Sequence, residues 1–69
     1  MGGIYQKKVR EENLKRIIRF LHRRGITSRT TIAKELGLSP SAVTNLVAHL
    51  CEVGLIREGG FGEDGVNLL

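Results

Sequence analysis

The chain has 69 residues, of which 41% are hydrophobic and 26% are charged. This length allows one small domain with a single core, and the composition is that of a folded protein rather than a disordered chain. No apolar run is long enough to span a bilayer, and one cysteine excludes both an internal disulfide and a cysteine-based zinc site. We therefore expect a cytoplasmic globular domain with no membrane contact, no metal and no other cofactor.

The net charge of +4 is unevenly distributed. Residues 1–29 hold nine basic and two acidic side chains, whereas residues 30–69 hold two basic and five acidic ones. The two parts thus carry +7 and −3, and the basic part would attract a polyanion such as a nucleic-acid backbone. Charge alone is explained equally well by a solvated basic helix without a partner.

The first predicted element is a helix over about residues 9–24, preceded by a mobile arm over residues 1–8 that has no apolar period. The domain is accordingly expected over residues 9–69. Gly25 ends the helix, and the arginines are expected to face water. The apolar face of this helix consists of Leu14, Ile17, Ile18 and Leu21.

Two shorter helices follow. One starts at Ser28, whose hydroxyl caps the first turn, and stops at Gly37; the other starts at Ser39 with Pro40 in its first turn and stops at Gly54. At each of the three stops a glycine precedes an apolar residue, which is the Schellman pattern of a left-handed glycine followed by a side chain that packs back on the helix. Their inward residues are Ile32, Ala33 and Leu36 in the second helix, and Val43, Leu46, Val47 and Leu50 in the third.

The hydrophobic period changes after Gly54. Residues 55–58 and 66–69 are predicted to form two short strands around a glycine-containing loop, and Ile26-Thr27 is a candidate for a brief third strand. The fold class is therefore mainly α with a small β-hairpin: three helices plus a two-stranded wing.

Only Gly37, Leu38 and Ser39 separate the second and third helices, which is the short connection of a helix-turn-helix unit. With four residues of the third helix buried, the opposite face is small and polar and fits a major groove. Asn45 carries both a donor and an acceptor for an adenine edge. The outward residues are Ser41, Asn45, Ala48 and Glu52, flanked by Thr44 and His49.

A series of short motifs covers nearly the whole chain after residue 8. They are Val9-Arg10, Asn13, Gly25 to Arg29, Ile32-Ala33, Leu36 to Ser39, Val43-Thr44, Leu46-Val47, Leu50, and Gly54 to Gly59. Together they resemble the N-terminal winged helix-turn-helix domain of the ROK family of transcriptional repressors of sugar metabolism. This resemblance implies sequence-specific binding of double-stranded DNA as the operator-reading part of a sugar-responsive repressor. A MarR-like regulator fragment and a winged helix that binds another protein remain alternatives.

The resemblance implies a DNA-binding role for residues at both helix starts and along the third helix. The wing departs from the family, because Glu63 and Asp64 near its tip would repel phosphate where family members commonly have a Gly-Arg step. We expect a monomer for this chain and a dimer or larger assembly in a longer parent. The expected DNA contacts are Ser28, Arg29, Ser39, Ser41, Thr44, Asn45 and His49, together with Lys8 and Arg10 of the basic part.

An enzyme is not expected. His22 and His49 lie on different predicted helices, and no nucleophile with a neighbouring base, paired carboxylates or phosphate loop is present in the pattern. Cys51 follows buried Leu50 and is expected to pack rather than to act as a redox switch. Phe20 and Tyr5 are too few to form a stacking platform for single-stranded RNA.

Overall fold

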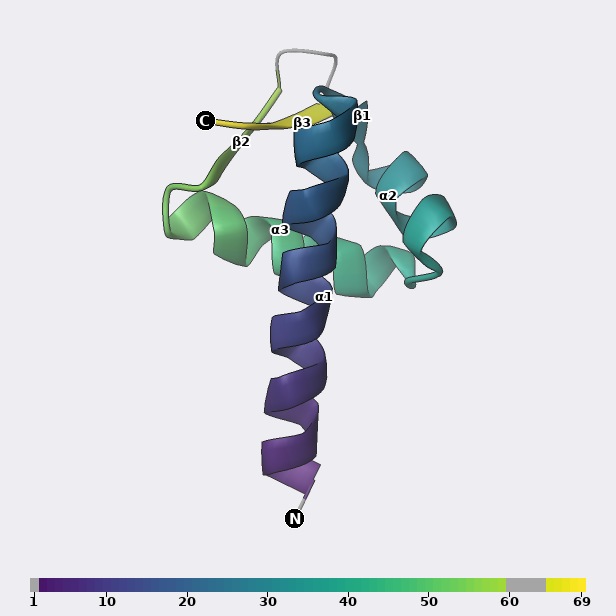
Figure 1. Ribbon diagram of the computed structural model, residues 1–69, viewed down its shortest axis with the longest axis vertical. Helices are drawn as coiled ribbons and strands as arrows, with labels where there is room; N and C mark the ends of the chain where they lie inside the picture. Colours follow the sequence, from purple (N-terminus) through teal and green to yellow (C-terminus); the bar gives the residue numbers. More distant parts are fainter. Residues whose placement is uncertain (1, 60–64) are drawn as a thin grey trace.

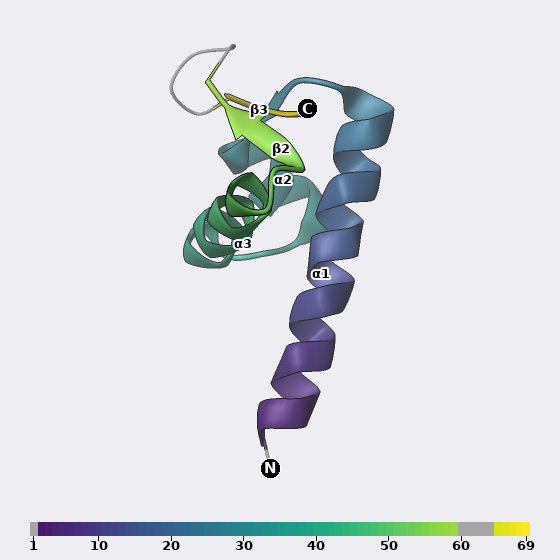
Figure 2. The same cartoon turned by 90° about the vertical axis from the view of Figure 1, so that its left-hand side faces the viewer.

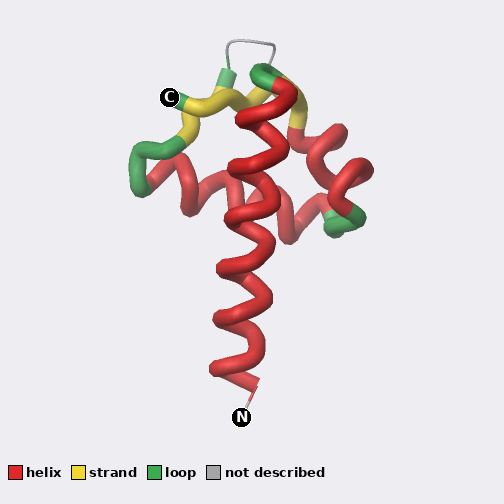
Figure 3. Tube along the Cα trace, in the orientation of Figure 1, coloured by secondary structure: helices red, strands yellow, loops and turns green. Residues whose placement is uncertain are grey.

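Three helices and a small antiparallel sheet form the fold in the computed structural model, which describes residues 2–59 and 65–69. The long first helix crosses the third, and the sheet lies near the C-terminal end of the first helix (Figures 1 and 3). This confirms the prediction of three helices and a hairpin. The elements are α1 (Gly2–Arg24), β1 (Thr27–Ser28), α2 (Arg29–Leu36), α3 (Pro40–Glu52), β2 (Ile56–Glu58) and β3 (Gly65–Leu68).

The sheet has the strand order β1-β3-β2, so the last strand of the chain lies in its centre. Thr27 pairs with Val66 on one side of β3, and Glu58 pairs with the same residue on the other. The brief third strand is confirmed, one residue later than Ile26-Thr27. The loop tip with Glu63 and Asp64 lies outside the described residues.

The core draws on every helix and on two strands. The periodic residues of all three helices are buried or packed against the core, as expected, and Val43 and Val47 of α3 are fully buried. Phe20 is also buried, although it was not expected there, and Arg24 lies over its ring at 5.3 Å from the centroid. The buried core residues are Ile17, Phe20, Leu21, Ile32, Ala33, Val43, Leu46, Val47, Leu50, Ile56 and Val66.

The start of α1 corrects one prediction. The helix begins at Gly2, so residues 2–8, expected as an arm, are helical. Gln6, Lys7 and Lys8 are good helix formers and can extend the backbone hydrogen bonds of the following turns without an apolar face. No such face is needed, because the N-terminal end of α1 projects beyond the other elements (Figure 2).

Side-chain caps begin both short helices, as predicted. Ser28 Oγ accepts a hydrogen bond from the Thr31 backbone N–H at 3.0 Å, and its hydroxyl donates to Thr31 Oγ1 at 2.9 Å. Ser39 Oγ accepts from the Ala42 N–H at 3.2 Å. The bonds from the Thr31 and Ala42 N–H groups each satisfy a donor that the helix itself leaves without an acceptor.

The backbone at the helix ends agrees with the predicted Schellman pattern, but the apolar contact that the pattern includes is not formed at every end. Gly37 and Gly54 are left-handed, with φ of +67° and +82°. The following N–H groups, of Leu38 and Leu55, reach back to the Ala33 and Leu50 carbonyls at 2.9 and 3.0 Å, as in a Schellman motif. Leu38 packs against the core, but Leu55 is 49% exposed and Ile26, after Gly25, is 47% exposed. The expected apolar contact is therefore confirmed only for Leu38.

Replacing Ser28 tests its cap. Ser28→Ala should lower the free energy of unfolding by about 1 kcal/mol, because the Thr31 N–H loses its acceptor. Ser28→Asp is the matched control and should retain most of the stability, since aspartate also caps. Urea unfolding followed by circular dichroism measures both. Equal stability of the alanine variant and the original chain would contradict the cap.

Candidate nucleic-acid interface

The arrangement of α2 and α3 is that of a helix-turn-helix unit. Residues 37–39 join the two helices, and the Leu38 and Ser39 bonds described above fix both ends of this turn. The core contacts of α3 turn its opposite side to solvent. The exposed residues on that side are Ser41, Thr44, Asn45, Ala48 and Glu52. The small polar face predicted for the third helix is therefore present, and we call it the α3 face.

The serines at the start of α3 have different positions. Ser39 is exposed, and its Oγ caps the helix. Ser41 lies on the α3 face itself, with its Oγ 3.4 Å from Ser39 Oγ. Ser41 is thus the hydroxyl presented on the outer face, whereas the first role of Ser39 is to stabilise the helix that presents it.

A hollow of about 370 Å³ lies between α3 and the N-terminal half of α1. It places Arg10 of α1 beside Asn45 of α3, two residues that are 35 positions apart in sequence. Gln6 and Asn13 were not expected near the site. They follow the spacing i, i+4, i+7 through Arg10, and this signal was missed because residues 1–8 were not interpreted as helical. The lining residues are Gln6, Val9, Arg10, Asn13, Ala42, Asn45 and Leu46.

A smaller hollow, of about 200 Å³, lies on the other flank of α3, against α2. Its lining residues are Arg29, Thr30, Ala33, Pro40 and Thr44. Arg29 also forms an ion pair with Glu58 of β2, in which the two side chains are 21% and 46% exposed. The guanidinium therefore links the start of α2 to the wing, and Arg29 lines the same hollow as Thr44. Ser28, one residue earlier, is engaged as the cap of α2.

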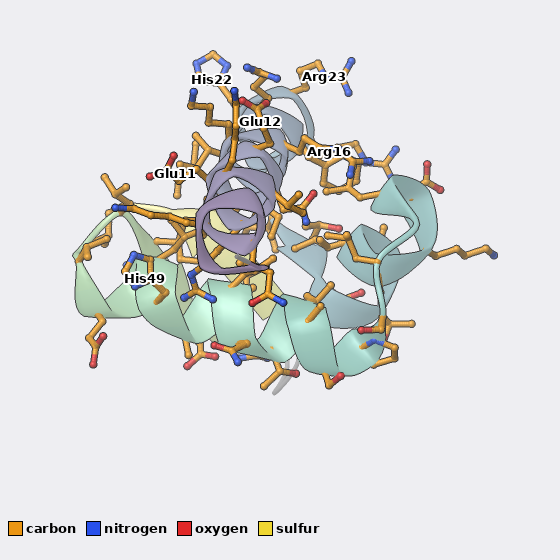
Figure 4. The ribbon with its side chains drawn as sticks, turned by 90° about the horizontal axis from the view of Figure 1, so that it is seen from below. Glu11, Glu12, Arg16, His22, Arg23 and His49 are labelled. Carbon is orange, nitrogen blue, oxygen red and sulfur yellow. The ribbon has the colours of Figure 1, made fainter. Side chains whose placement is uncertain are left out.

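Two of the expected contacts, Lys8 and His49, line other hollows. Lys8 is exposed on a different side of α1, in a shallow hollow shared with Glu12 and Arg16. His49 is half-buried and lies where α3 passes α1 (Figure 4), near Glu11. The structure thus brings together Ser41, Thr44 and Asn45 with one arginine on each flank, and it does not bring Lys8 or His49 to their centre.

The positive charges around α3 come from the neighbouring helices. Helix α3 contains no lysine or arginine, and its titratable side chains are His49, Cys51 and Glu52. Arg10 and Arg29 supply positive charge from α1 and α2. The first half of the α3 face therefore offers the neutral hydrogen-bonding groups Ser41, Thr44 and Asn45 with cations at the sides, which suits base edges between phosphates, whereas Glu52 places a negative charge at its C-terminal end.

In the part of the chain that the structure describes, no three side chains of His, Cys, Asp or Glu are grouped so that they could hold a metal ion. Within the same residues, no helix combines the length and apolar character that crossing a membrane requires.

The three helices, the small sheet and the helix-turn-helix geometry define a winged helix-turn-helix protein. Comparison with known proteins gives its family. Residues 10–57 match the model of the winged helix-turn-helix DNA-binding family. The match covers more than half of the chain, and this protein belongs to that family. No curated protein matches the sequence.

Solved structures show the same fold. The Zalpha domain of PKZ from Carassius auratus, solved in complex with Z-DNA, has a TM-score of 0.82 and 26% identity, over 88% of this chain and 98% of that one. The Zalpha domain of ORF112 from Cyprinid Herpesvirus 3 has a TM-score of 0.77 and 24% identity, over 86% and 95% of the two chains. CymR from Staphylococcus aureus has a TM-score of 0.68 and 30% identity over 86% of this chain. This chain spans only 50% of the CymR chain.

Proposed function

We propose that this protein binds right-handed duplex DNA through the α3 face and serves as the operator-reading domain of a transcriptional repressor. The observation that carries the proposal is the exposed row Ser41, Thr44 and Asn45 between two arginines, in a chain of the winged helix-turn-helix DNA-binding family. An α-helix of ordinary diameter enters the major groove, and the small side chains of this row allow close approach.

Within this proposal the residues divide into two roles. Asn45 donates to and accepts from an adenine edge, while Ser41 and Thr44 bind phosphate or base. Arg10 and Arg29 lie at the flanks and contact the phosphate backbone of the two strands. Glu58 holds Arg29 at the α2 flank in the absence of DNA, so binding exchanges or shares this ion pair.

The finer assignment is to a sugar-responsive repressor of the ROK family. It is supported by the motif series from Val9 to Gly59, and the effector sugar would bind outside this chain. Full affinity would then require two linked half-sites, and this domain alone should bind weakly and with strong salt dependence. If the chain is instead a MarR-like regulator fragment, it should bind a different operator. If it is a protein-binding winged helix, it should have no affinity for duplex DNA.

A second candidate is binding of left-handed DNA. The specific observation in its favour is the similarity, over 98% of its length, to a Zalpha domain solved with Z-DNA. Both candidates use the same fold, so the conformation of the bound DNA separates them.

Substitutions on the α3 face and at its flank should have different effects. Asn45→Ala should weaken binding to the preferred duplex by about 1 to 3 kcal/mol and change binding to random duplex little, because a base contact is lost. Arg29→Ala should weaken both duplexes about equally and reduce the salt slope by roughly one unit. Fluorescence anisotropy on a selected and a random duplex, at several salt concentrations, measures both effects.

Two results would count against this division of roles. One is an equal loss on both duplexes for Asn45→Ala, and the other is a loss of sequence preference for Arg29→Ala. Absence of any binding at low salt would instead favour the protein-binding alternative.

The handedness of the bound DNA is tested with an alternating dC-dG duplex at low salt. Addition of excess protein should leave the circular dichroism spectrum of the duplex right-handed, because the α3 face is proposed to occupy a major groove. A random-sequence duplex is the matched control. Inversion of the long-wavelength bands for the alternating duplex alone would establish the second candidate.

A further inference from the structure

The side of α1 that faces away from α3 carries a row of cations. Lys15, Arg19 and Arg23 are exposed and follow one another at intervals of four residues, which places them along one line of the helix. We call these three residues the α1 stripe. Figure 4 shows Arg23 and the adjacent His22 pointing away from α3, on the opposite side of α1.

The charge of the α1 stripe is little compensated. Lys15 Nζ lies 3.8 Å from Glu12 Oε2, and in the part of the chain that the structure describes Arg19 and Arg23 form no ion pair. No acidic residue occurs between positions 13 and 34. The adjacent basic residues are engaged elsewhere: Arg16 donates to the Leu36 carbonyl at 2.7 Å, and Arg24 lies over the Phe20 ring.

The length of the row matches a DNA strand. The eight steps from Lys15 to Arg23, at about 1.5 Å of rise each, span about 12 Å. One strand of a duplex carries a phosphate every 3.4 Å or so of helix axis, and the row therefore covers the axial length of about three to four phosphates. The α1 stripe and the α3 face lie on opposite sides of the molecule, so a single straight duplex cannot contact both.

The chemistry of this side favours a nucleic-acid backbone over an anionic membrane surface. An interfacial membrane helix needs an apolar face to insert, and the apolar face of α1 is turned inward. Its residues Ile17 and Leu21 are at most 1% exposed. Beside the α1 stripe, Ile18 is only partly exposed and packs against the core. The α1 stripe is therefore a regular line of positive charge with no exposed apolar face beside it that could insert into a membrane.

We propose that the α1 stripe binds the phosphate backbone of a second DNA duplex while the α3 face binds the first, so that one molecule bridges two DNA segments. The inference rests on the proposed function for the first duplex only. The second contact is sequence-independent and salt-sensitive, since it consists of phosphate contacts.

Capture of a free duplex by an immobilised one tests the inference. Beads carry the preferred duplex, and a fluorescent random duplex is added with the protein at low salt. The original chain should retain the fluorescent duplex. Arg19→Gln/Arg23→Gln should bind the bead duplex but lose the capture at least tenfold, and its salt slope on random duplex should fall by about two units.

Three control variants test whether capture depends on positive charge, on the position of that charge, and on the α1 stripe rather than the α3 face. Arg19→Lys/Arg23→Lys should keep the capture, and Lys7→Gln/Lys34→Gln, which removes two exposed charges elsewhere, should also keep it. Asn45→Glu should lose sequence preference yet still bind random duplex through the α1 stripe. Circular dichroism checks that each variant is folded, which the exposure of these positions leads us to expect.

The outcomes distinguish failure of this inference from failure of the proposed function. Undiminished capture by Arg19→Gln/Arg23→Gln, or saturation of the original chain at one duplex per molecule, would overturn the second site and leave the α3 face unaffected. Loss of all DNA binding in Arg19→Gln/Arg23→Gln, with none lost in Asn45→Glu, would refute the proposed function instead. Full displacement of the captured duplex by polyglutamate at equal charge would show that the α1 stripe prefers an acidic polypeptide, contrary to the inference.

Discussion

The burial of one side of α3 is the constraint on which the rest of the structure depends. Val43, Leu46, Val47 and Leu50 are each at most 4% exposed and belong to the same core as residues of α1, α2, β2 and β3. Since a helix turns about 100° per residue, fixing this side also fixes the opposite one. Rotation of α3 would expose these side chains at about 1.5 to 3 kcal/mol each, so the α3 face is held toward solvent.

The neighbours of α3 then determine the charges at its flanks. Because α1 crosses α3 on one side, Arg10 lies beside Asn45; because α2 is packed on the other, Arg29 lies beside Thr44. The pair between Arg29 and Glu58 joins this flank to β2. Much of the remaining positive charge lies on the far side of α1. One small core thus separates the polar α3 face, with its flanking cations, from a strongly basic face.

Features that depend on local pattern could be predicted from the sequence, and features that depend on distant contacts could not. The apolar period of the third helix gave its buried side, and hence its exposed polar residues, while Ser28 and Ser39 marked the helix starts. Residues 2–8 were missed because a helix that extends past the core needs no apolar period. The Arg29–Glu58 pair and the approach of Arg10 to Asn45 join residues 29 and 35 positions apart, and no local signal encodes them.

The central claim is that the α3 face is the surface that meets DNA, and an NMR titration tests it most directly. Backbone amide shifts of the 15N-labelled chain are followed as a duplex is added in amounts below one equivalent. The account predicts that the largest changes occur at Ser41, Thr44, Asn45 and Ala48, with smaller ones at Arg10 and Arg29. Changes confined to the outer side of α1, with α3 unaffected, would contradict it.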